Sequence, residues 1–264
     1  MKVALFVDLL GARRKWQTGG VPEATRAFNH FSQMVIAAAR QSSAGTILDG
    51  GIETDSAMLI CDGPITALTI AGRLYHWAFQ NARRPDAPRL WLRGSLVPFD
   101  DDEFIRREAT ANIPLDNVNI FTYSPNALDA ISIEKAGFKG MRLLLREETV
   151  DDEVRAAFRI PFDGYALIPL RRLRHIGYPV VIEGRLIDFL WMATGDDDEW
   201  HDISIHMTSR LRHSAKDPEE FAQAAATQVV FHECAAIRQS VKTRARRAAE
   251  RLDAHGQPAH ATDG

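Results

Sequence analysis

The first residues of the chain constrain its fold more than any other stretch. Residues 3–7 are a run of five apolar side chains, and Asp8 ends the run. A short apolar run bounded by a turn is typical of a strand that is covered on both faces. The acid comes too early for the core of a secretory signal, and no small-residue cleavage site follows. We therefore predict a buried first strand that ends in a turn at residues 8–11.

The next elements alternate between helix and strand patterns. A basic, flexible loop is expected over residues 13–20, and a helix from about Pro22, because proline suits the first turn. Two strands, residues 46–53 and 56–61, predict a tight hairpin. The later expectations are a helix from Pro64, strands over 89–98, 118–123 and 141–145, a helix over 127–136, a hairpin over 177–194 and a long helix over 217–252. This order predicts an α+β fold with helices layered on one side of a sheet.

Charge and composition exclude several classes of protein. The net charge is −3, which does not suit a chain that binds nucleic acid along its whole length, so the basic stretch 242–251 is interpreted as a solvated helix face or a partner contact. The two cysteines, Cys61 and Cys234, have no metal-type spacing and suit a reducing cytoplasm. No apolar run approaches the ~18–20 residues of a membrane-spanning helix. We expect a cytoplasmic protein without a nucleic-acid or membrane partner.

Two carboxylates are the most informative candidate site residues. Asp8 follows the first strand, and Asp55 lies at the tip of the hairpin. In a β-α-β-β unit the hairpin pairs beside the first strand, so the two side chains can converge. Convergent carboxylates beside a backbone-rich turn suit divalent metal ions with a nucleotide polyphosphate, and the N–H groups of residues 9–12 could bind phosphate. The alternative is structural, because aspartate is also common in turns.

Four motifs carry a resemblance to a known family. Phe6, Asp8 and Gly11 resemble the strand and turn of class III nucleotidyl cyclases, and residues 52–61 resemble their second-carboxylate hairpin. Residues 93–96 resemble the next strand, and residues 127–134 with 141–144 resemble a later helix and strand. The resemblance covers about residues 1–150 and implies a ferredoxin-like βαββαβ core. With it we expect a catalytic domain over 1–195, a C-terminal helical extension over 196–252 and a disordered tail over 253–264.

The resemblance also implies roles for individual residues. Asp8 and Asp55 would be catalytic and would hold two Mn²⁺ or Mg²⁺ ions, with the Leu9 carbonyl as a further ligand. The family works as a head-to-tail homodimer with active sites at the interface. The positions that would contact the nucleotide are Phe6, Gly11, Ala12, Arg13, Gly51, Glu53, Thr122 and Asp129.

Departures from the family pattern concern the base and the transition state. Purine cyclases have a lysine where this chain has Gly51, an aspartate or similar group at Thr122, and an asparagine and an arginine at Asp129 and Ile133. A chain without this purine set resembles the pyrimidine nucleotide cyclases of bacterial Pycsar anti-phage systems. That resemblance implies cyclic UMP from UTP, or cyclic CMP from CTP, as a messenger for a separate effector. The candidate cations for the transition state are Arg13, Arg14, Lys15, Lys135 and Arg142.

Two other functions remain open from the residues. A metal-dependent nuclease or phosphatase also fits a strand ending in aspartate, although such folds usually carry three or four acids at strand ends. Here the later strands carry Arg93 and Tyr123 instead. A catalytically degenerate cyclase-like module that only binds nucleotide or a partner is the third hypothesis. Loss of the helix arginine favours it, and retention of both aspartates opposes it, because crowded carboxylates repel each other without a cation.

Overall fold

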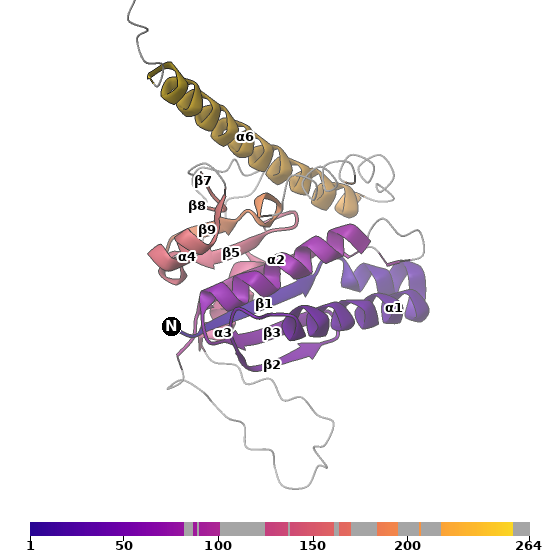
Figure 1. The fold of residues 1–264 in the computed structure, drawn as a ribbon. Coiled ribbons are helices and arrows are strands. Elements are labelled where there is room, and N and C mark those ends of the chain that lie inside the picture. The colour runs from indigo at the N-terminus through magenta and orange to yellow at the C-terminus, as the bar shows by residue number, and fades with distance from the viewer. Residues whose placement is uncertain are drawn as a thin grey trace, which may run out of the picture.

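The chain folds around one mixed sheet, described here from a computed structural model (Figure 1). The structure describes residues 1–81, 87–88, 90–100, 125–136, 138–160, 164–169, 184–194, 206 and 218–255. The elements of the first half are β1 (Val3–Leu9), α1 (Ala12–Arg40), β2 (Ile47–Glu53), β3 (Ser56–Cys61), α2 (Pro64–Asn81), β4 (Leu92–Pro98) and α3 (Pro125–Lys135). Those of the second half are β5 (Leu143–Arg146), α4 (Asp152–Ala157), β6 (Arg159–Ile160), β7 (Gly164–Tyr165), β8 (Leu167–Pro169), β9 (Leu186–Phe189) and α6 (Pro218–His255).

The strand order identifies the core. The main sheet runs β2-β3-β1-β4-β5-β9-β8, and among these described strands only the β4–β5 pair is parallel. Its first four strands, in the order β2-β3-β1-β4 and all antiparallel, with α1 and α2 as crossovers, make the split βαβ arrangement of ferredoxin-like folds. The expected α+β class and βαββαβ core are confirmed.

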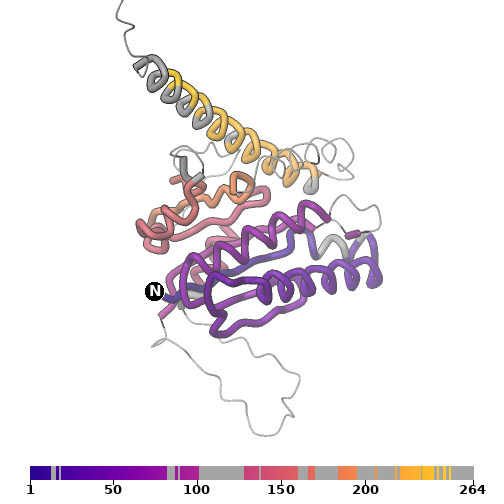
Figure 2. Tube along the Cα trace, viewed as in Figure 1, coloured from indigo at the N-terminus to yellow at the C-terminus, as the bar shows by residue number. Residues whose placement is uncertain are grey.

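Helices cover both faces of the sheet, so the expectation of helices on one side is wrong. The larger core packs Val3, Leu5 and Val7 of β1 against α1 and α2, whereas Ala4 and Phe6 pack on the opposite face against α3. Successive side chains of a strand point to opposite faces, and β1 is apolar on both. Each face therefore needs a cover, and the tube in Figure 2 lets the two layers be followed along the chain.

The first helix begins earlier than the sequence predicts. The expected loop over residues 13–20 is helical, because α1 runs from Ala12 and contains a kink at Gly20, with φ 67° and ψ −171°. Only glycine adopts this conformation readily, and the kink resets the helix so that Pro22 falls in the first turn after it. Proline therefore marks the start of the second helical segment and not the start of the helix.

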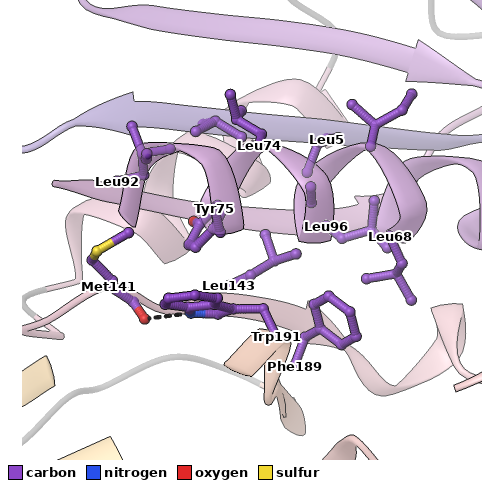
Figure 3. Packing of buried hydrophobic residues seen from close by; sticks show 14 of the residues in the cluster. Leu5, Leu68, Leu74, Tyr75, Leu92, Leu96, Met141, Leu143, Phe189 and Trp191 are labelled. Atoms are coloured by element: carbon purple, nitrogen blue, oxygen red, sulfur yellow. Dashed lines mark hydrogen bonds between the residues drawn. The ribbon is translucent and has the colours of Figure 1, made fainter. Parts of the chain in front are cut away.

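The larger core is closed by an aromatic cluster beneath α2 (Figure 3). The indole of Trp191 lies 5.6 Å from the ring of Tyr75, centroid to centroid, and its N–H donates to the Met141 carbonyl at 3.0 Å. The Tyr75 hydroxyl donates to the Arg142 carbonyl at 2.8 Å. Both polar atoms are thus satisfied within the core, as buried polar groups require. The start of β5 is thereby attached to α2 and to the residues after β9.

The C-terminal helix is confirmed and continues past the expected end of the helical extension. α6 packs with its first half on the sheet domain, and its second half projects away from it (Figure 1). The boundaries expected at residues 195 and 252 stay predictions. The strand expected over 118–123 and the first half of the hairpin over 177–194 lie outside the described residues. Within the described part of the chain, no helix is long and apolar enough to cross a membrane.

Candidate active site

A row of polar side chains crosses four strands at one end of the sheet. Glu53 of β2 is in register with Ser56 of β3, Ser56 with Asp8 of β1, and Asp8 with Arg93 of β4. Directly paired residues share a face, here the face that α3 covers in part, and neighbouring strands lie ~4.8 Å apart. The row two residues further along is Gly51, Met58, Phe6 and Ser95. The polar side chains on this face therefore cluster at the end of β1.

The hairpin tip is fastened to the end of β1. The Leu9 N–H donates to the carbonyl of Asp55, N to O 2.7 Å, and the Leu10 N–H donates to the Trp91 carbonyl at 2.8 Å. The turn that follows Asp8 is thus tied to β3 on one side and to the start of β4 on the other. Asp8 and Asp55, which lie 47 positions apart in the sequence, are brought to the same end of neighbouring strands.

The pKa of Asp8 is shifted by burial and by its position close to other carboxylates. Burial, followed by the nearby Glu134 and Asp55 carboxylates, raises its pKa from 3.8 to about 7, although Arg93 and Lys135 act in the opposite direction. Desolvation and like charge both penalise the ionised form of a carboxyl group. A carboxylate in this position gains from a cation beside it, and a strongly perturbed group at a strand end is a functional-site candidate.

Arg93 is a site residue that sequence reasoning did not single out. Its Nε donates to Glu134 Oε1 at 2.5 Å, and its Nη1 donates to the carbonyl of Phe138 at 2.7 Å. The Arg93 side chain is 13% exposed and that of Glu134 is 2% exposed. The sequence marked Arg93 only through a family motif. Its neighbours Asp8 and Glu134 come from β1 and α3, so only the tertiary pairing identifies it.

The turn after Asp8 leads into an open helix N-terminus. Gly11 is exposed, has φ 75° and precedes α1, whose first turn contains no acidic residue and no side-chain cap. A Cβ at Gly11 would meet nothing within 4 Å, so its positive φ is the feature that calls for glycine. Uncapped N–H groups at a helix N-terminus favour anions such as phosphate. Ala12 is buried, and the Arg13 side chain lies outside the described residues.

The hairpin that carries Asp55 contains a strained residue. Thr54 has φ 39°, and among the described residues it is the only non-glycine with positive φ. Positive φ at the first of two loop residues is the sign expected of a type II′ hairpin, where glycine is normally found. For a β-branched residue this conformation is an outlier that costs of order 1–3 kcal/mol. Such strain is typical of functional sites, and here it adjoins the second carboxylate.

Other expected residues lie elsewhere. Asp129 forms a bidentate ion pair with Arg146, with N to O distances of 2.8 and 2.5 Å. β5 ends at Arg146, and the preceding Leu145 is in register, through β4, with Leu5. At ~3.3 Å per residue, that level is about 10 Å along β1 from Asp8. The nucleotide role of Asp129 stays a prediction, and Thr122 lies outside the described residues.

The candidate cations are placed differently from one another. The Arg142 side chain is 5% exposed and forms a buried ion pair with Asp188 at 2.6 Å, which removes it from the site. Lys135, at the end of α3, is exposed and close enough to lower the pKa of Asp8. Ile133, which stands where purine cyclases have an arginine, is fully buried in the α3-side core. Within the described residues, Arg93 and Lys135 are therefore the cations that act on Asp8.

Comparison with known proteins finds similarity among solved structures only. No family model matches the chain, and no curated protein matches it in sequence. The chain is similar to the monomeric guanylyl cyclase domain of the RhoGC fusion protein from the aquatic fungus Blastocladiella emersonii, with 9% identity, a TM-score of 0.46, and 72% of this chain and 94% of that one covered. It is also similar to a bacterial light-regulated adenylyl cyclase, with 11% identity, a TM-score of 0.49, and 79% of this chain and 96% of that one covered. A third similar structure is that of adenylate cyclases from Trypanosoma brucei, with 12% identity, a TM-score of 0.46, and 74% of this chain and 89% of that one covered. At such identities the chemistry has to be argued from the residues of this chain.

Proposed function

We propose that the chain is a metal-dependent nucleotide cyclase that converts a nucleoside triphosphate into a 3′,5′-cyclic nucleotide and diphosphate. One observation carries the proposal. The hydrogen bond from the Leu9 N–H to the Asp55 carbonyl holds the two aspartate-bearing segments together, beside the uncapped start of α1 and the cation Arg93. Carboxylates, phosphate-binding N–H groups and a cation are the parts that phosphoryl chemistry requires.

The donor set suits magnesium or manganese. Mg²⁺ keeps several of its waters and is usually bound by one or two carboxylates together with substrate phosphates. Asp8, Asp55 and the Leu9 carbonyl offer such a set. Within the described residues no group of three or more His, Cys, Asp or Glu side chains could hold a metal alone, so the triphosphate would have to complete the coordination. When bound, two divalent ions would supply activation of the 3′-hydroxyl and neutralisation of the leaving diphosphate.

The residues of the chain would have separate roles in binding the metal ions, the phosphates and the developing charge. Asp8 and Asp55 would hold the cations at the end of β1. The N–H groups that follow Gly11 would bind phosphate oxygens, and the fixed guanidinium of Arg93 would face the charge that develops on them. The 3′-oxygen attacks the α-phosphorus, the bond to the diphosphate breaks, and the 3′-hydroxyl proton leaves to solvent.

The finer proposal concerns the substrate and its use. UTP is the proposed substrate, giving cyclic UMP, and CTP is the alternative. The support is that Gly51 and Ile133 cannot supply the side chains used by purine cyclases. We place the product in bacterial anti-phage defence, as a messenger for a separate effector, by resemblance to the Pycsar cyclases. By the same resemblance, two copies of the chain would form the active sites at a homodimer interface.

A direct assay tests the proposal. Purified protein is incubated with Mn²⁺ and each of ATP, GTP, CTP and UTP, and products are identified by chromatography and mass. We expect a cyclic pyrimidine nucleotide from the wild type, none from Asp8→Ala or Asp55→Ala, and full activity from Asp49→Ala, an exposed carboxylate on the same hairpin. A cyclic purine would overturn the pyrimidine assignment. Activity in either site variant would overturn the site. No product would favour a binding module, and release of free phosphate would favour a hydrolase.

A further inference from the structure

The C-terminal helix holds the segment that leads into β5. The Gly140 N–H donates to Gln223 Oε1 at 2.7 Å, and the Met141 N–H donates to Thr227 Oγ1 at 3.0 Å. The Thr227 hydroxyl donates in turn to the Gln223 carbonyl at 2.8 Å, so it is used in both directions. The side chains of Gln223 and Thr227 thus act as hydrogen-bond acceptors for two consecutive backbone N–H groups of this segment.

This contact is close and shielded from water. Gly140 has φ 88°, and a Cβ there would lie 2.8 Å from the backbone N of Thr227 and 3.0 Å from the carbonyl carbon of Ala226. The backbone of the segment therefore packs directly on α6. Gln223 is 6% exposed and Thr227 is fully buried. Buried hydrogen bonds of this kind have no competing solvent, and an N–H that loses its partner there pays a desolvation penalty.

The residues on either side of Gly140 and Met141 contact Arg93 and its neighbour Gly94 on β4. The Phe138 carbonyl accepts from Arg93 Nη1 at 2.7 Å, and the Arg142 carbonyl accepts from the Gly94 N–H at 2.9 Å. The Tyr75 hydroxyl also donates to the Arg142 carbonyl (the core around Tyr75 and Met141 is drawn in Figure 3). Residues 138–142 thus connect α6 on one side with Arg93 and Gly94 on the other. Arg93 is the residue in register with Asp8.

We propose that Gln223 and Thr227 of α6 are positioning residues for the Arg93 guanidinium at the active site. They fix the segment whose Phe138 carbonyl, together with Glu134, sets the direction of the Arg93 side chain. The C-terminal helix is then a part of the catalytic unit and not only a cover for the sheet. The consequence for catalysis rests on the proposed cyclase function, whereas the positioning itself is a property of the fold.

A pair of matched variants on one helix tests the proposal. Thr227→Val keeps the shape of the side chain and removes the acceptor of the Met141 N–H. Thr243→Val is the control, because Thr243 Oγ1 donates along its own helix, to the Gln239 carbonyl at 2.9 Å. We expect Thr227→Val to lower kcat/KM about tenfold, equal to ~1.4 kcal/mol of transition-state stabilisation. Thr243→Val and the hydroxyl-retaining Thr227→Ser should remain within about twofold of the wild type.

A double-mutant cycle separates positioning from general destabilisation. Arg93→Lys keeps the charge and loses the guanidinium fork that the Phe138 carbonyl and Glu134 hold. If Thr227 acts through Arg93, Thr227→Val should have almost no further effect on kcat/KM in the Arg93→Lys background. An unchanged tenfold loss in that background would overturn the proposal, as would wild-type kcat/KM in Thr227→Val itself. All variants are assayed at a temperature at which thermal unfolding curves show each of them folded.

A readout without turnover keeps the proposal testable if the chain makes no cyclic nucleotide. Exchange of the Arg93 Nε–H with solvent is followed by ¹⁵N NMR in the metal-free protein. We expect Thr227→Val to accelerate this exchange about tenfold, by loosening the segment that holds the guanidinium, and Thr243→Val to leave it unchanged. Equal exchange in the wild type and Thr227→Val would refute the positioning proposal. Absence of product together with accelerated exchange would refute the cyclase function and support the positioning role.

Discussion

Replacing Asp8 by asparagine should stabilise the metal-free protein at neutral and alkaline pH. The folded chain holds the Asp8 carboxyl in a place where burial, Glu134 and Asp55 raise its pKa from 3.8 to about 7. At 1.36 kcal/mol per pKa unit, keeping this group ionised above pH 7 costs the fold up to about 4 kcal/mol. The asparagine side chain has nearly the same shape as that of aspartate and carries no charge. We expect Asp8→Asn to raise the free energy of unfolding by about 2–4 kcal/mol at pH 8.

The sign of the pH dependence follows from the same values. Between pH 3.8 and about 7 the folded chain keeps a proton on Asp8 that the unfolded chain has lost. The native state then binds more protons, and its stability falls as the pH rises through this range. Below about pH 4 the carboxyl is protonated in both states, so the advantage of Asp8→Asn should vanish there. Urea unfolding of both proteins at pH 4, 6 and 8, with a chelator present, measures this difference directly.

The control for Asp8→Asn is Asp49→Asn on the exposed edge strand β2, which should change the stability by less than about 0.5 kcal/mol at each pH. Equal stability of Asp8→Asn and the wild type at pH 8 would refute the argument from crowded carboxylates. A gain of the same size at pH 4 and pH 8 would also refute it, because a pH-independent gain cannot come from the charge. If the gain is observed, Asp8 is retained at a cost to stability, as expected of a group that holds a cation.

Three further substitutions test the geometry around the site. Thr54→Gly should stabilise the chain by about 1 kcal/mol in thermal or urea unfolding, because glycine relieves the positive φ, whereas an equal loss would contradict the strain. Gly94→Ala should destabilise it by about 2–3 kcal/mol, since the new Cβ would overlap the Phe6 carbonyl oxygen, and a neutral result in urea would show that β1 and β4 can separate. Arg142→Met should lower the free energy of unfolding by about 3–5 kcal/mol at pH 7, because it leaves Asp188 buried without its ion pair. The loss should be smaller at pH 4, because burial raises the pKa of Asp188 and the carboxyl can then take up a proton. A cost that does not depend on pH would assign the loss to packing.

Much of the fold was readable from local patterns. The apolar run at residues 3–7, the tight hairpin at residues 54–55 and the helix from Pro64 each depend on neighbouring residues, and the structure has β1, the β2–β3 hairpin and α2 in those places. The sequence predicts a start of the first helix that is too late, because Gly20 followed by Pro22 is also the pattern of a loop that leads into a helix. A glycine with positive φ inside a helix has the same local signature as a loop glycine.

Some residues of the candidate site can be identified from the local sequence, and others only from the tertiary structure. Asp8 and Asp55 can be identified from the sequence because Asp8 directly follows an apolar strand and Asp55 lies in the turn between two strands. An aspartate at such a place either stabilises the turn or serves a functional site. Arg93, Glu134 and Gln223 do not stand out, because an arginine in a strand and polar residues in helices are common on any protein surface. Their relation to Asp8 arises only when β4 pairs with β1, α3 covers one face and α6 packs on the residues before β5.

The sequence by itself therefore predicts the α+β class, the order of the core elements and the two aspartates as candidate site residues, since the patterns that indicate them lie among near neighbours in the chain. The tertiary structure decided that helices cover both faces of the sheet, that Arg142 is buried with Asp188 and that Arg93 stands beside Asp8. The physical reason is that burial and charge are properties of the space around a side chain. That space is formed by segments far apart in the sequence, such as β1, α3 and α6 here.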